Sequence, residues 1–250
     1  MENNIILTNY FTSKQDPQKH KYKKKQKAEN VGFLRDKGKW PSDSKKLISP
    51  WINTLTLLNL KGVIFFDSSI SKKFTHECTN DNVSFEYYKI STGWSLNDER
   101  FLCWYNWLTK HDIIKNVFTT DLFDVIFNKN PFDLITDEYD IYTGQNQNKP
   151  IEKSSRISRR MKGRYGKILH KDKIDASAGV IGGSRDNMLK LFECMLKEFK
   201  KFNNSSNNNM IVYNKCLYDL FDSKRVLVGP PVSSKYRHYQ KSGNFAIKHK

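Results

Sequence analysis

Two carboxylates three positions apart have the chemistry of a metal site. Asp121 and Asp124 stand in the segment NVFTTDLFDVIFNKNPF (116–132), directly after the apolar residues Val117 and Phe118. Carboxylates at the end of a strand can hold a divalent cation, and that cation can hold the phosphates of a nucleotide. Acidic residues after a strand also serve as turn and helix-cap residues. The spacing Asp-x-x-Asp is therefore compatible with a metal site or with a structural turn.

The overall charge favours anionic partners. The chain of 250 residues carries a formal net charge of +17, with 38% hydrophobic and 13% aromatic residues. This composition can fill the core of one α/β domain, and the basic balance suits nucleotides, nucleic acid or an acidic membrane surface. Basic residues gather in three runs, at 19–27, 156–173 and 235–250. The first is typical of a solvated loop, whereas the other two lie beside segments expected to carry the site.

The cysteine spacing and the length of the apolar runs indicate in which cellular compartment the protein is expected. The four cysteines, Cys78, Cys103, Cys194 and Cys216, are far apart and form no CxxC pair. This spacing favours a reduced intracellular protein over a zinc site or a disulfide framework. No apolar run reaches membrane-spanning length, and no signal peptide precedes the first strand. We therefore expect a cytoplasmic protein without a membrane span.

Apolar strands that alternate with helical patterns predict the scaffold. Strands are expected at 5–7, 63–67, 83–90, 117–118, 139–143, 178–181 and 226–228. Helices are expected from Ser49 with Pro50 at the first helical position, from Ser95, from Ser184 and over 209–221. Such alternation predicts βαβ units and a mostly parallel sheet flanked by helices, in one domain over residues 1–250.

Local signals add detail to two of these helices. Ser95 and Asp98 form a capping-box-like start, and Arg100 falls on the polar side of the helix. The expected buried face of that helix is Leu96, Phe101, Trp104 and Leu108. Gly182 and Gly183 predict a tight turn between the strand at 178–181 and the helix capped by Ser184.

Three segments should meet at one edge of the sheet. In parallel sheets, ligands bind at the carboxyl ends of the strands. Residues 8–11, 120–124 and 179–183 are the segments expected at that edge. The candidate metal site and the two glycines would therefore lie close together.

Four segments, in this order, resemble the nucleotide-sugar-dependent glycosyltransferases of the GT-A fold. They are IILTNYFTSKQDPQ (5–18), SLNDERF (95–101), NVFTTDLFDVIFNKNPF (116–132) and SAGVIGGSRDNMLKLF (177–192). More narrowly, the chain is similar to small soluble enzymes of this fold in large DNA viruses and some eukaryotes. The resemblance implies a Rossmann-like GT-A domain, with Asp-x-x-Asp as a variant of the usual Asp-x-Asp motif.

The resemblance also implies a metal shell. Asp121 and Asp124 match the carboxylates that bind Mn²⁺ or Mg²⁺, with Asp124 the firmer ligand by analogy. Because the spacing departs from Asp-x-Asp, the alternative is that one of the two aspartates binds the donor sugar or ribose instead of the metal. The closing segment FAIKHK resembles the C-terminal segment of many such enzymes, in which a histidine completes the shell; His249 is the candidate. Lys248 and Lys250 would lie near the phosphates, and the basic tail at about 233–250 would close over the site.

Further residues are implied as donor-binding candidates. Thr8, Asn9, Tyr10 and Phe11 match the strand end that holds base and ribose, with Tyr10 or Phe11 stacked on the base or simply packed beneath the loop. Arg100 resembles a basic residue that reaches the diphosphate or the donor sugar, and Asp98 one that holds sugar hydroxyls. The alternatives are a helix cap for Asp98 and a solvated side chain for Arg100. The remaining donor-binding candidates are Lys14, Thr120, Gly182 and Gly183. Asp121 and the spare carboxylate Asp175 are the catalytic candidates.

The implied activity is transfer of a sugar, as a hexosyl or deoxyhexosyl group, from a nucleoside-diphosphate sugar to a glycan or another hydroxyl acceptor. A UDP-sugar is the first candidate donor, and the general base and stereochemistry stay open. One alternative is a basic nucleic-acid-binding protein with a steep salt dependence. The chain has no RRM, KH or zinc-finger signature, so no nucleic acid is expected as a partner. Another alternative is a non-catalytic nucleotide-sugar binder of the same fold.

Overall fold

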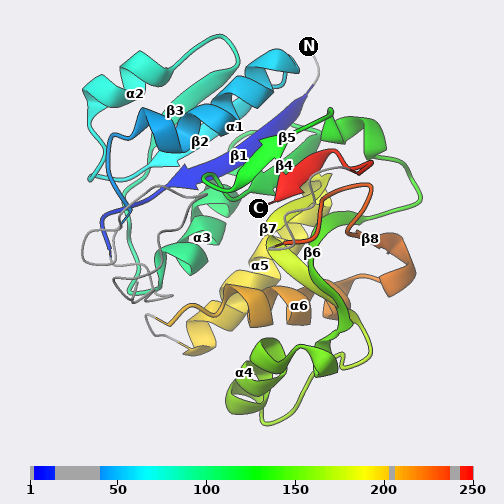
Figure 1. Cartoon of the computed structure of the whole chain (residues 1–250). Helices are drawn as coiled ribbons and strands as arrows, with labels where there is room; N and C mark the ends of the chain where they lie inside the picture. The colour runs from blue at the N-terminus through cyan, green and yellow to red at the C-terminus, as the bar shows by residue number, and fades with distance from the viewer. Residues whose placement is uncertain (1–2, 15–39, 203–205, 237–242, 250) are drawn as a thin grey trace, which may run out of the picture.

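A seven-stranded mixed sheet runs through the centre of the protein (Figure 1). The computed structural model describes residues 3–14, 40–202, 206–236 and 243–249. Sheet order is β3-β2-β1-β4-β7-β6-β8. The strand bounds are β1 (Asn4–Tyr10), β2 (Gly62–Phe66), β3 (Val83–Tyr87), β4 (Asn116–Thr120), β6 (Ile141–Pro150), β7 (Ile174–Ser184) and β8 (Val226–Val228). The predicted α/β class, with a mostly parallel sheet flanked by helices in one compact domain, is confirmed.

Strand direction changes between β4 and β7. Strands β1 to β4 are parallel, so their carboxyl ends meet at one edge of the sheet. Strand β7 is antiparallel to β4, with Val180 opposite Thr120 and Ser184 opposite Asn116. The middle of β7, rather than its end, therefore lies beside the carboxyl end of β4.

Helices cover one face of the sheet, and a helix with a small second sheet covers the other. The elements concerned are α1 (Lys45–Leu57), α3 (Leu96–Leu108), α5 (Arg185–Phe202), α6 (Asn209–Leu220) and β5 (Val125–Phe127). Leu7 and Val117 are buried on the face that packs against α3, α5 and α6. Ile6 and Phe118 point the opposite way and pack with residues of α1 and β5. This alternation gives two apolar layers around one sheet.

Most local helix predictions are confirmed. Helix α3 begins after Ser95, whose Oγ accepts a hydrogen bond from the Asp98 backbone N–H at 3.2 Å. Its predicted inward residues are all buried: Leu96, Phe101, Trp104 and Leu108. Helix α5 begins at Arg185, directly after Ser184, and α6 begins at Asn209 as expected. The tertiary core therefore agrees with the apolar periodicity in these three helices.

Helix α1 begins earlier than predicted. It starts at Lys45, four residues before the expected N-cap Ser49, and Pro50 lies inside it. Leu47 and Ile48 are buried and extend its apolar face backwards. Packing of that face outweighs the preference of proline for the first helical turn.

The predicted turn at Gly182 and Gly183 is wrong. Both glycines lie inside β7 and pair with Phe118 and Val117 at the start of β4. A Cβ at Gly182 would come within 2.2 Å of the Phe118 ring, and a Cβ at Gly183 within 2.7 Å of the Asp140 carbonyl oxygen. The glycines are therefore required for close packing in a strand, and not for a turn.

A small antiparallel sheet brings the end of the chain back to the central sheet. Strand β9 (Ile247–His249), red in Figure 1, pairs with β5, and His249 lies opposite Val125. Because Asp124 immediately precedes Val125, this register places His249 beside Asp124. The two residues are 125 positions apart in the chain.

Two further α-helices and three short 3-10 helices, η2 (Pro131–Leu134), η3 (Ile151–Lys153) and η4 (Ser223–Arg225), complete the described part of the fold. Helix α2 (Lys72–Cys78) lies beside β3, and α4 (Ser155–Tyr165) lies below α6 at the bottom of Figure 1. Within the described ranges, no helix combines the length and the apolar character needed to cross a membrane.

Candidate metal centre

Asp121, Asp124 and His249 form one cluster at the carboxyl end of β4. A carboxylate oxygen of each aspartate and a ring nitrogen of the histidine all lie within 4.8 Å of one another. His249 Nε2 is 3.5 Å from Asp121 Oδ2 and 3.8 Å from Asp124 Oδ2. The histidine side chain is 2% exposed, whereas the two carboxylates are 31% and 36% exposed. The cluster thus has a buried imidazole and two acidic groups that a ligand can reach from solvent.

Backbone hydrogen bonds hold two of the three residues of the cluster, Asp121 and His249. The Asp121 N–H donates to the Gly179 carbonyl oxygen at 2.9 Å, which ties the end of β4 to β7. The His249 N–H donates to Ser234 Oγ at 2.9 Å, and Ser234 Oγ lies 3.1 Å from the His249 carbonyl oxygen. Ser234 is buried and was not predicted, since nothing in its local sequence distinguishes it.

Arg100 contacts the cluster from α3 through Asp121. The prediction that Arg100 lies on the polar side of α3 is wrong, because its side chain is buried. Its Nη1 forms an ion pair with Asp121 Oδ1, and its Nη2 donates to the Ala178 carbonyl oxygen at 3.0 Å. The guanidinium also lies over the rings of Phe101 and Trp104. Arg100 is only 8% exposed, because its partner Asp121 comes from a neighbouring strand end.

Opposite charges set the ionisation of the cluster. Desolvation opposes the charge on Asp121, but Arg100 and then His249 outweigh it and hold the pKa of Asp121 well below its usual range. Desolvation, together with the Asp121 carboxylate, raises the pKa of Asp124 although His249 opposes this shift. Burial alone would lower the pKa of His249, yet the two carboxylates raise it. The field between the aspartates therefore favours a cation.

The donor set fits a divalent metal ion. Neither ring nitrogen of His249 has a hydrogen-bond partner among the described residues, although both are buried. A buried imidazole without a hydrogen-bond partner is costly, and coordination of a cation would satisfy one of its nitrogens. Two carboxylate oxygens and one imidazole nitrogen suit ions such as Mn²⁺ or Mg²⁺, and they do not by themselves identify the ion.

Gly179 is a site residue that the sequence interpretation did not single out. A Cβ there would lie 2.4 Å from His249 Cε1 and 2.6 Å from Asp121 Oδ2. Only glycine leaves room for the aspartate and the histidine on this strand. Gly179 lies in the segment 179–183 that the sequence predicts at this edge, and the first glycine in SAGVIGG was the available signal.

Of the predicted first-strand residues, Thr8 and Tyr10 lie in the interior. Thr8 Oγ1 donates to the Thr120 carbonyl oxygen at 2.8 Å, and Thr120 Oγ1 accepts from Trp51 Nε1 at 2.9 Å. Tyr10 is completely buried, and its hydroxyl donates to the Pro41 carbonyl oxygen at 2.8 Å. These hydrogen bonds connect β1 to neighbouring segments. Tyr10 is therefore packed in the interior, which was the alternative to stacking on a base.

The rest of that segment forms the loop after β1. Asn9 is half-buried beside Cys103 of α3, and the buried ring of Phe11 stacks on Tyr88 with centroids 5.5 Å apart. Lys14 Nζ donates to the carbonyl oxygens of Thr92 at 2.7 Å and Trp94 at 3.2 Å. Lys14 thus joins this loop to the segment that precedes α3.

Asp67 fixes the same loop and was not predicted as a site residue. It is completely buried at the end of β2, and its Oδ2 accepts from the backbone N–H groups of Thr12 and Ser13, each at 3.0 Å. Its Oδ1 accepts from the Ser69 N–H at 3.0 Å. An aspartate directly after the apolar run VIFF was the available signal.

Two predicted carboxylates lie outside the cluster. Asp98 accepts the Asn208 backbone N–H at 3.0 Å, and burial raises its pKa to about 7. Asp175 accepts from Ser154 Oγ at 2.8 Å and from Asn146 Nδ2 at 3.0 Å, and burial raises its pKa. Neither belongs to the candidate metal-binding group, and both hold neighbouring segments in place.

The remaining predicted donor-binding residues are dispersed. Gly182 and Gly183 pair with the start of β4, away from its carboxyl end. Lys248 lies in β9 opposite Ile126, on the strand face opposite to that of its neighbour His249. Lys250 and the basic run at 19–27 lie outside the described residues.

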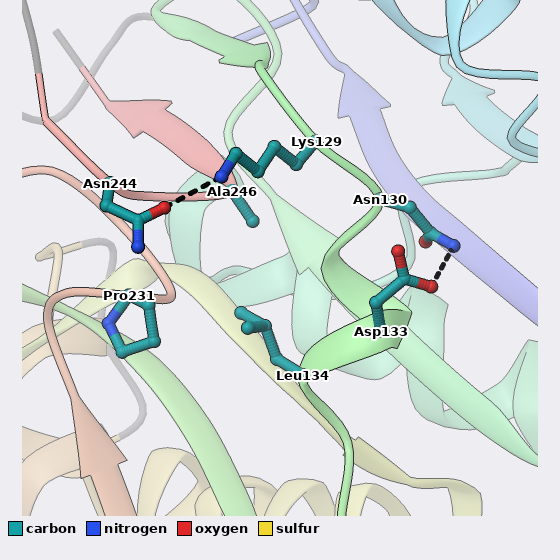
Figure 2. A pocket seen from close by; sticks show the side chains of 7 residues that line it. All are labelled: Lys129, Asn130, Asp133, Leu134, Pro231, Asn244 and Ala246. Carbon is teal, nitrogen blue, oxygen red and sulfur yellow. Dashed lines mark hydrogen bonds between the residues drawn. The ribbon is translucent and has the colours of Figure 1, made fainter.

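A pocket of about 310 Å³ next to the β5–β9 pair is separate from the cluster (Figure 2). Its lining is Lys129, Asn130, Asp133, Leu134, Pro231, Asn244 and Ala246. Lys129 Nζ donates to Asn244 Oδ1 at 2.8 Å, and Asn130 Nδ2 donates to Asp133 Oδ1 at 2.7 Å. These polar groups bond to one another, as the dashed lines of Figure 2 show, so we assign the pocket no part in the site.

No protein-family model matches the chain, and no curated protein is similar to it in sequence. A functional interpretation therefore depends on the geometry of the cluster and its surroundings.

Proposed function

We propose that the protein is a metal-dependent glycosyltransferase of the GT-A fold that uses a nucleoside-diphosphate sugar as donor. The observation that carries this proposal is the cluster of Asp121, Asp124 and His249 at the carboxyl end of a central parallel strand. The loop after β1 ends at the same edge, where ligands of open α/β sheets bind. The net charge of +17 suits an anionic donor.

In this proposal, Asp121, Asp124 and His249 hold Mn²⁺ or Mg²⁺. The bound ion would neutralise the diphosphate that leaves when the anomeric carbon is attacked by an acceptor hydroxyl. Arg100 is a positioning residue, because its ion pair keeps Asp121 ionised and fixes its orientation. Ser234 is a second positioning residue, because its hydroxyl oxygen accepts a hydrogen bond from the backbone N–H of His249.

The loop at residues 11–14 is the proposed place for the base and ribose of the donor. Asp67 holds its backbone through Thr12 and Ser13, so the loop is fixed relative to β2. A loop held in this way costs less entropy on binding than a free one. The proposed acceptor is a glycan or another hydroxyl compound. The four cysteines form no disulfide, although the Sγ atoms of Cys194 and Cys216 lie 2.6 Å apart, and the proposed compartment is the reducing cytoplasm.

A donor-hydrolysis and transfer assay tests the proposal. Purified protein is incubated with UDP-, GDP- and dTDP-sugars, with Mn²⁺, with Mg²⁺ or with EDTA, and released nucleoside diphosphate is measured. We expect release that requires the metal and is lost in Asp121→Ala. A variant Lys129→Ala, in the pocket of Figure 2, is the matched control and should retain activity.

Two results would contradict this function in different ways. Metal-dependent binding of a nucleotide sugar without any turnover would indicate a non-catalytic binder of the same fold. Absence of binding to every nucleoside diphosphate in the presence of Mn²⁺ would reject the nucleotide site itself.

A further inference from the structure

Helix α4 carries a row of arginines that the proposed metal centre does not use. Arg156, Arg160 and Arg164 are spaced four residues apart, so their side chains lie along one face of the helix. The sequence of α4, SRISRRMKGRY, contains no acidic residue. Like charges at this spacing repel one another, so the row costs stability unless an anion offsets it.

Two of these arginines line a pocket. A cavity of about 310 Å³ is lined by Arg160, Gly163, Arg164 and Ser206. A Cβ at Gly163 would meet no heavy atom within 4 Å, so there is open space above the helix backbone at this position. Ser206 precedes α6, and the pocket therefore lies where α4 approaches the start of that helix.

Arg160 is half-buried there without a carboxylate partner. No described acidic side chain lies within ion-pair distance of it. Burial, followed by the charges of Arg156 and Arg164, lowers its pKa, whereas Asp98 raises it. Asp98 is engaged with the Asn208 backbone N–H. A partly desolvated guanidinium without a described carboxylate partner is the complement of an oxyanion.

Arg164 is held by a different contact. Its guanidinium lies over the ring of Phe202 at the end of α5, 5.4 Å from the ring centroid. This contact orients the side chain and leaves its N–H groups available to a ligand. Arg160 and Arg164 therefore present two guanidinium groups to one cavity.

The pocket is connected to the proposed metal centre through described contacts. Arg100 pairs with Asp121 and is electrostatically coupled to Asp98. Asp98 in turn holds Asn208, two residues after Ser206 of the pocket lining. The pocket and the centre thus flank the junction of α3 and α6.

We propose that Arg160 and Arg164 bind a compact oxyanion, and that this group belongs to the acceptor substrate. The class comprises phosphate, sulfate and carboxylate groups, which guanidinium ions recognise through paired hydrogen bonds. The pocket has four lining residues, two of them arginines, which suits a compact group. Oxyanion binding is independent of the proposed transferase, whereas the assignment to the acceptor rests on it.

Isothermal titration with simple anions tests the pocket directly. Inorganic phosphate, sulfate and acetate are titrated at constant ionic strength into the wild type, Arg160→Gln, Arg160→Lys and Arg159→Gln. We expect saturable binding of at least one anion, weakened about tenfold in Arg160→Gln and partly restored in Arg160→Lys. Comparison of the phosphate, sulfate and acetate arms identifies the acid group that fits.

Arg159→Gln is the matched control, because it removes the same charge from the same helix. Arg159 is exposed and does not line the pocket. If anion affinity is weakened equally in Arg159→Gln and Arg160→Gln, or if no anion binds saturably, the proposed oxyanion site is wrong. Far-ultraviolet circular dichroism verifies that each variant is folded.

Two further measurements separate this proposal from the transferase. Arg160→Gln should leave Mn²⁺ affinity unchanged, and Asp124→Asn should leave anion affinity unchanged while Mn²⁺ binding is lost. Once an acceptor for the transferase is found, Arg160→Gln should raise its KM and leave the KM of the donor unchanged. An unchanged acceptor KM would overturn the acceptor assignment alone.

Discussion

The protein has carboxylates in two kinds of surroundings. Asp98 and Asp175 lie in the interior, and their oxygens accept hydrogen bonds from backbone, hydroxyl and amide donors. Asp121 and Asp124 lie after the end of β4, where they face Arg100 and a buried histidine whose ring nitrogens make no hydrogen bond to described residues. The carboxylates of the interior pair have hydrogen-bond partners within the protein. The carboxylates at β4 instead offer oxygen atoms, together with the His249 ring, that could hold a metal ion. Surroundings, rather than burial alone, distinguish a structural carboxylate from a candidate ligand.

The largest expected effect is loss of metal binding in Asp124→Asn. The amide keeps the shape of the side chain but removes the charge, so Mn²⁺ affinity should fall by more than about 100-fold. Isothermal titration with Mn²⁺ measures the change. Asp175→Asn is the interior counterpart and should bind Mn²⁺ as the wild type does; equal losses in the two variants would abolish the distinction between the two kinds of carboxylate.

Asp98 predicts how stability depends on pH. Its pKa of about 7 lies above the ordinary value, so between pH 4 and 7 the folded state binds more protons than the unfolded state. The free energy of unfolding therefore falls as pH rises, by roughly 2 to 3 kcal/mol from pH 5 to pH 8. Urea unfolding of the wild type and Asp98→Asn measures this, and the variant should lose that part of the slope. An identical slope in both proteins would contradict the assignment.

Gly179→Ala sharpens the comparison without a change of charge. The added Cβ would displace the His249 ring or the Asp121 carboxylate, since each lies within 2.6 Å of it. We expect about a tenfold loss of Mn²⁺ affinity and a loss of about 1–3 kcal/mol in unfolding free energy. Gly163→Ala, at an open position on α4, is the control. Wild-type Mn²⁺ affinity in Gly179→Ala would show that the cluster is not the binding site.

The smallest effect is expected for Ser234→Ala. It removes the side-chain hydrogen bonds to the backbone of His249, each with a net contribution of about 1 kcal/mol. Mn²⁺ affinity should fall severalfold, and thermal unfolding should occur at a slightly lower temperature. If affinity and stability both stay unchanged, Ser234 does not position the histidine.

Local patterns in the sequence were sufficient for much of the fold. The Ser95 cap and the apolar spacing of α3 predict that helix because both signals lie within a few residues of it. The strand before Asp121 and the helix from Asn209 follow from equally local patterns. The direction of β7 was not predictable in this way, because its pairing with β4 joins residues about 60 positions apart.

The candidate site was predicted less completely, for the same physical reason. Asp121 and Asp124 were found from their position after a strand, and His249 only through a resemblance at the chain end. The burial of Arg100 depends on Asp121, and the role of Gly179 depends on both Asp121 and His249. Such requirements appear only once the chain has brought distant residues together.

Titration of the wild-type protein with Mn²⁺, followed by UDP, is the most direct test of the central claim. We expect one Mn²⁺ site per chain, lost in Asp124→Asn, and UDP binding that requires Mn²⁺ and disappears with EDTA. If the protein binds no divalent ion, or binds UDP equally well with EDTA, the cluster at β4 is not a metal-nucleotide site.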